Sequence, residues 1–136
     1  MERAIFIDGA DVKDLPKMWN EKMDELLHVV PDTDAQGVLQ DMHWSDGSFG
    51  YFPSYLLGSI YDGMFLEAIE KDLGSIDDIL AAGEIKKITK WLNEKIHQYG
   101  ATRISSEVLE SVCGQELSAK PLIRHFKDKY AKIYNF

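Results

Sequence analysis

The chain has 136 residues, 45% apolar and 28% charged, a composition typical of a folded soluble domain rather than a disordered segment. Its net charge of −8 at pH 7 argues against a surface for nucleic acid or anionic membranes. The acidic N-terminus lacks a signal-peptide pattern, and the single cysteine, Cys113, excludes an intrachain disulfide. We therefore expect a cytoplasmic protein with no membrane or nucleic-acid partner.

The first third of the chain predicts two helices. Asp14 followed by Pro16 is typical of a helix start, and apolar residues recur at helical spacing from there to Leu27. A shorter helix is expected over residues 34–44, with a turn after it. Residues 4–7 are the only candidate strand, and a single strand would have nothing to pair with.

The rest of the chain predicts further helices, over about residues 51–73, 75–82, 84–99, 105–114 and 119–134. In the longest of them, the small residues Gly58, Ser59 and Gly63 would let another helix approach closely. The last helix carries an apolar stripe that we expect to face the core, formed by Leu122, Ile123, Phe126, Tyr130 and Ile133. The pattern predicts an all-α fold, with residues 1–136 forming one domain.

Residues 37–55, GVLQDMHWSDGSFGYFPSY, have the composition of a site, because titratable and aromatic groups are dense there and a plain core would use Leu and Val. His43, Tyr51 and Tyr55 offer hydrogen-bond donors that suit a peptide carbonyl or a developing oxyanion. A purely structural interpretation stays open, in which polar groups tie down loops and aromatic rings fill the core. The residues with that structural role would be Gln40, Asp41, His43, Trp44, Phe49 and Phe52.

A metal site made by this chain alone is not expected. Asp32 and Asp34 begin a calcium-loop frame, but its twelfth position is His43, where calcium needs a bidentate Glu. The four histidines are scattered, and Cys113 has no second thiolate for zinc. Asp41 and His43 are two positions apart, so on one helix they would point in roughly opposite directions.

The string from Gly37 to Trp44 matches GxxQDxHW, the signature of the Taq-type (thermostable) zinc metallocarboxypeptidases, and the chain resembles that family. The flank that follows, SDGSFGYFPSY, and the earlier segment DLP…WNEKM continue the pattern. The resemblance covers essentially the whole chain, and it matches only the C-terminal portion of such an enzyme.

The resemblance implies roles for individual residues. His43 would hold the carbonyl of a peptide substrate, and Tyr51 would donate to the oxyanion, with Tyr55 as a second candidate. Gln40, Asp41 and Trp44 would hold these neighbours in place.

In the family, zinc is bound by the two His of an HExxH helix and a later Glu, and the HExxH Glu is the general base. No HExxH occurs in this chain, so we assign it no metal ligand. We expect zinc or cobalt only in the intact enzyme and no hydrolysis by the chain alone.

The alternative function is a non-catalytic binding or assembly module. A segment shaped to pack inside a larger helical enzyme would expose apolar surface, and such surface favours association. The chain would then form a homo-oligomer or dock onto a separate HExxH-bearing polypeptide.

Overall fold

The computed structural model describes residues 1–135, and all regular elements in that range are helices, which confirms the predicted all-α fold. The chain divides into two compact units, residues 1–53 and the residues from Ser54 onward. The organisation as a single domain stays a prediction. No helix within the described range is long and apolar enough to span a bilayer.

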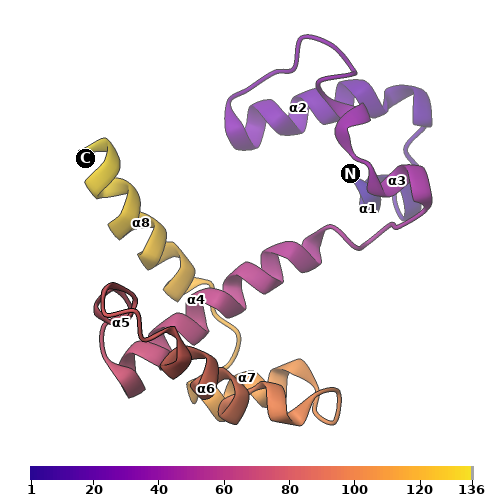
Figure 1. Ribbon diagram of the computed structural model, residues 1–136. Coiled ribbons are helices and arrows are strands. Elements are labelled where there is room, and N and C mark those ends of the chain that lie inside the picture. The colour runs from indigo at the N-terminus through magenta and orange to yellow at the C-terminus, as the bar shows by residue number, and fades with distance from the viewer. Residues whose placement is uncertain (136) are drawn as a thin grey trace. The chain divides into compact units, whose positions relative to one another are not determined.

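The first unit contains three α-helices joined by short 3₁₀ turns (Figure 1). The α-helices are α1 (Glu2–Phe6), α2 (Leu15–Leu27) and α3 (His43–Asp46), and the 3₁₀ turns are Val12–Asp14 and Val38–Gln40. The candidate strand at residues 4–7 is thus wrong for this segment, most of which lies in α1. A helix satisfies its own backbone groups, whereas a lone strand could not.

The predicted helix over residues 34–44 is wrong for all but its last two residues, and residues 34–37 form turns. Val38–Gln40 forms only a 3₁₀ turn, and Asp41 has a β-region backbone with φ −76° and ψ 101°. The α-helix α3 begins only at His43. This break places Asp41 ahead of α3, where its carboxylate can turn back onto the first turn of the helix.

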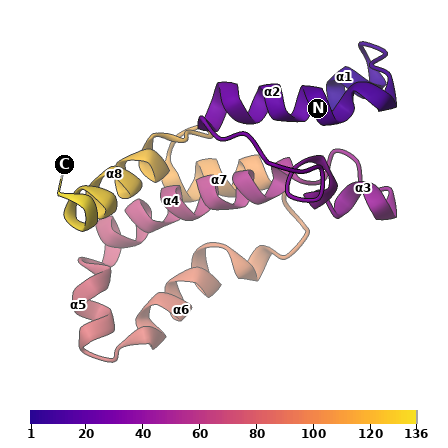
Figure 2. The same cartoon turned by 90° about the horizontal axis from the view of Figure 1, so that it is seen from above.

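The second unit contains five α-helices (Figures 1 and 2). They are α4 (Pro53–Leu73), α5 (Ile76–Ala81), α6 (Ile85–Lys95), α7 (Ser105–Cys113) and α8 (Lys120–Tyr134). The 3₁₀ turn His97–Tyr99 follows α6, so the expected helix over residues 84–99 ends as α-helix several residues early. In both views α8 begins beside α4.

Helices α4 and α8 meet at Gly63, as the small residues of α4 predict. A Cβ on Gly63 would lie 2.7 Å from the backbone N of Leu122 and 2.8 Å from its Cα. Beside this crossing, the Ser118 backbone N–H donates to Met64 Sδ at 3.3 Å. Farther along, Arg124 Nε donates to Glu67 Oε1 at 2.9 Å, which fixes the direction of α8 across α4.

Helix α6 is attached to the end of α4 through Asp72. The Trp91 indole N–H donates to Asp72 Oδ2 at 2.8 Å, and Lys95 Nζ lies 3.8 Å from the same oxygen. Trp91 is also buried, so one side chain supplies both apolar burial and a directional bond.

Few apolar side chains of the described chain are buried: Leu15, Val38, Met64, Ile69, Ile79, Trp91 and Leu109. The accessible surface is 10215 Å², whereas two separate globular units of these sizes would expose only about 8,600 Å². The predicted core face of α8 is wrong in this respect, because Ile123 is 49% exposed and Ile133 56%. Each unit therefore presents apolar helix faces that its own described residues leave uncovered.

Gly63→Ala should lower the free energy of unfolding by about 1–3 kcal/mol, because the added Cβ meets the backbone of α8 and the helices must move apart. Gly58→Ala is the matched control in the same helix, since a Cβ there meets nothing within 4 Å. That variant should be neutral or stabilising, by roughly 0.5–1 kcal/mol. Urea unfolding followed by circular dichroism measures both. Equal stabilities of the two variants would contradict the close crossing.

Candidate functional site

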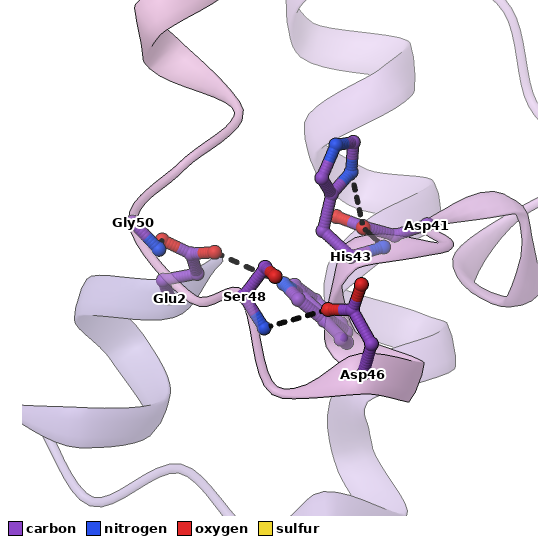
Figure 3. Close-up of polar contacts among 7 residues, drawn as sticks. Glu2, Asp41, His43, Asp46, Ser48 and Gly50 are labelled. Carbon is purple, nitrogen blue, oxygen red and sulfur yellow. Dashed lines mark hydrogen bonds and ion pairs between the residues drawn. The ribbon is translucent and has the colours of Figure 1, made fainter.

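Asp41 and His43 form a closely joined pair at the start of α3 (Figure 3). The His43 backbone N–H donates to Asp41 Oδ1 at 2.9 Å, and His43 Nδ1 lies 3.4 Å from the same oxygen. Their side chains are only 11% (Asp41) and 23% (His43) exposed. The prediction that they point apart is wrong, because Asp41 lies before the helix rather than in it.

The structure brings Tyr51 to the imidazole of His43. The two ring centroids are 5.7 Å apart with an interplanar angle of 34°. Phe52 approaches the same imidazole edge-to-face at 5.4 Å. Tyr51 is 54% exposed, so the pair lies at the surface of the first unit rather than in its core.

Glu2 is a site residue that the sequence did not indicate. Its Oε1 accepts from the Trp44 indole N–H at 3.1 Å, and its Oε2 accepts from the Gly50 backbone N–H at 2.8 Å. Figure 3 shows Glu2 beside Gly50, at the far end of the loop from Asp41 and His43. An acidic residue near a chain end carries no local signal for contacts this distant in sequence.

Aromatic rings hold Trp44 from two directions. Trp19 of α2 meets it edge-to-face, with centroids 6.2 Å apart, and Phe49 stacks on it at 6.3 Å. Phe49 in turn contacts Phe6 of α1 at 4.8 Å. Trp44 and Phe49 thus contact other rings of the first unit, but they do not fill a core as the structural interpretation expects, because Phe49 is 46% exposed.

The loop after α3 is closed by Asp46, as the predicted turn requires. Asp46 Oδ1 accepts from the Ser48 backbone N–H at 2.9 Å (Figure 3). Hydrogen bonds from Ser48, the side-chain one first and the backbone one second, hold the pKa of Asp46 below its ordinary value. The carboxylate is the charged acceptor of this turn, and the lowered pKa extends its charged form to more acidic pH.

Gln40 and Tyr55 are the remaining predicted site residues. The Gln40 amide donates to the Ala35 carbonyl and so braces the preceding turn. Tyr55 lies in α4, within the second unit, and is 57% exposed. Its participation in a site with His43 stays a prediction.

A cavity of about 520 Å³ opens in the first unit beside this cluster. Its walls include Trp19, Trp44, Phe52, Glu2, Gln40 and Asp41. The lining combines the aromatic rings of Trp19, Trp44 and Phe52 with polar and charged side chains, and ligand pockets commonly combine such groups. The predicted supporting residues thus border a hollow rather than a filled core.

The described residues do not fit a catalytic metal. Across residues 1–135, no group of three or more His, Cys, Asp or Glu side chains could hold an ion. Burial raises the pKa of the Cys113 thiol, and the charge of Glu67 raises it further. A thiol kept protonated in this way is a poor ligand and a poor nucleophile.

The sequence model of the carboxypeptidase Taq (M32) metallopeptidases matches residues 1–130, and the chain belongs to this family. Carboxypeptidase 1 of Bacillus subtilis is 40% identical over 134 residues, which are 98% of this chain and 27% of that protein. Thermostable carboxypeptidase 1 of Pyrococcus furiosus is 37% identical over 130 residues, 96% of this chain and 26% of that protein. The chain therefore spans about a quarter of the length of these curated relatives.

Solved structures show the same helical fold. A Pyrococcus furiosus carboxypeptidase structure matches with a TM-score of 0.90 and 37% identity, over 95% of this chain and 26% of that one. The M32 carboxypeptidase of Deinococcus radiodurans R1 matches with a TM-score of 0.92 and 27% identity, over 99% and 27%. The resemblance expected from the GxxQDxHW motif is confirmed.

Proposed function

We propose that this chain forms the substrate-side, C-terminal portion of a metallocarboxypeptidase, an enzyme that hydrolytically releases C-terminal amino acids from peptides. The observation that carries the proposal is that the His43 imidazole contacts both the Asp41 carboxylate and the Tyr51 ring. Family membership supports the carboxypeptidase class.

In this proposal His43 binds the carbonyl oxygen of the scissile peptide. Either ring nitrogen of an imidazole can carry an N–H that donates to a carbonyl. Asp41 lies beside Nδ1 and fixes the ring orientation, so the opposite N–H can be directed to a carbonyl. The Tyr51 phenol then donates to the oxygen as negative charge develops on it, a contact that is strongest in the transition state. Tyr55 is the second candidate for this donor.

The metal and the general base come from another part of the intact enzyme, because the described residues offer no ligand set. We propose zinc, or cobalt in its place, bound by an HExxH helix, which would supply an activated water. A donor pair without that water gives only a small part of the acceleration, so the chain alone is inactive.

The alternative function is a non-catalytic assembly module in the cytoplasm, and the exposed apolar faces favour it. α2 ends with Leu26 and Leu27, which are 70% and 61% exposed, and the stripe on α8 is uncovered. Large exposed apolar faces commonly mark surfaces that bind another protein. The cover would be a second copy of the chain or a separate HExxH-bearing chain.

The purified chain should release no C-terminal residue from a blocked dipeptide, with or without added zinc or cobalt. A chimera of Bacillus subtilis carboxypeptidase 1 should regain metal-dependent hydrolysis when this chain replaces the segment that it matches. Turnover by the chain alone would contradict the missing metal half. A folded but inactive chimera would contradict the substrate-side role and favour the assembly module.

In that chimera, Tyr51→Phe should lower kcat by about a hundredfold while KM changes little, because the phenol acts on the developing oxyanion. Tyr134→Phe is the control, since that side chain is 68% exposed at the end of α8. Steady-state kinetics on the same dipeptide measures both. An unchanged kcat in Tyr51→Phe would return Tyr51 to a packing role.

Light scattering on the isolated chain should report a dimer or a larger species, because association covers the exposed apolar faces. A monomer at high concentration would contradict self-association.

A further inference from the structure

We infer that Glu2 is a positioning residue that sets the distance between His43 and Tyr51. The inference rests on the proposed function for what this pair does. The geometry does not depend on that function. The Glu2 carboxylate bonds Trp44, which follows His43 in the chain, and Gly50, which precedes Tyr51.

The two hydrogen bonds use both oxygens of the carboxylate. Oε1 accepts from the Trp44 indole at 3.1 Å and Oε2 from the Gly50 amide at 2.8 Å. An ionised carboxylate is acceptor-only at both oxygens, whereas a glutamine amide has one acceptor and one donor group. Gln at position 2 would turn an N–H toward one of the two N–H donors. The arrangement therefore requires Glu rather than any polar residue.

Each bond constrains one member of the pair. His43 and Trp44 are consecutive in α3, so their side chains leave the helix about 100° apart. Fixing the indole therefore fixes the rotation of α3 and with it the direction in which the His43 side chain leaves the helix, while Asp41 sets the orientation of the ring. Gly50 has φ +77°, a conformation that favours glycine, and its amide fixes where the backbone enters Tyr51. The 5.7 Å separation of the His43 and Tyr51 rings follows from both constraints.

Apolar packing does not replace this connection. Trp19 and Phe49 contact the ring of Trp44, and Phe6 contacts Phe49. These contacts orient the rings relative to one another but give the Gly50 amide no acceptor. Losing Glu2 should therefore loosen the loop before Tyr51 even where the rings stay packed.

The test compares Glu2→Gln with the wild-type 136-residue chain by ¹H–¹⁵N NMR. Three indole signals are expected, from Trp19, Trp44 and Trp91, and Trp44→Phe identifies that of Trp44. In Glu2→Gln the Trp44 indole signal should move, and the Gly50 amide should exchange with solvent roughly tenfold faster or more. The nuclear Overhauser contact between the His43 and Tyr51 rings should be lost.

Two controls separate positioning from unfolding. The Trp91 indole bonds Asp72 in the second unit, so its signal should not move. Glu25→Gln removes an exposed carboxylate that pairs with Lys22, three residues away in α2, and should change none of these signals. If Glu2→Gln does not fold, Glu2→Asp keeps the charge but is too short to reach both donors, and the same losses are expected.

The inference is overturned if a folded Glu2 variant keeps the His43–Tyr51 ring contact, whatever happens to the Trp44 signal. The proposed function is tested separately by titrating the wild-type chain with a blocked dipeptide that has a free carboxylate. Shifts of the His43 and Tyr51 signals would support substrate binding by this pair. No shifts would count against the proposed function, while the ring contact would still decide the role of Glu2.

Discussion

Two hydrogen bonds to Glu2 connect α1 with Trp44 and Gly50, which lie 42 and 48 positions later in the chain. They matter because the first unit buries few apolar side chains, with only Leu15 and Val38 buried among its residues. Hydrophobic burial of this extent does not select one arrangement of short helices and loops. Directional hydrogen bonds and edge-to-face ring contacts select one arrangement instead. The short helix α3 and the loop before Tyr51 depend on them.

The second unit also buries few apolar side chains, and a few contacts on α4 hold its helices together. Gly63 lets the backbone of α8 come close, Glu67 pairs with Arg124, and Asp72 receives the indole of Trp91. Outside these contacts, amphipathic helices turn apolar stripes to solvent. Because the chain spans about a quarter of its relatives, these stripes are consistent with surfaces that a larger helical protein would cover.

Helix positions follow from the sequence wherever local signals agree. The starts of α2 and α4 are marked by proline, Ser75 caps α5, and α7 lies within the predicted range. Prediction failed where tertiary contacts compete with local preference. Residues 34–44 look helical by spacing, yet the chain breaks at Asp41. The stripe on α8 predicts burial, but a stripe does not specify whether its cover belongs to the same chain.

The sequence by itself determined the all-α class, the family and the set of candidate residues, because helical periodicity and the GxxQDxHW motif are local patterns. Only the tertiary structure decided how those residues relate. It placed Asp41 ahead of α3 and against His43, brought Tyr51 to the imidazole, and joined their neighbours through Glu2. The physical reason is distance along the chain: a carboxylate in α1 selects its donors by where the backbone brings them, and no local pattern encodes that choice.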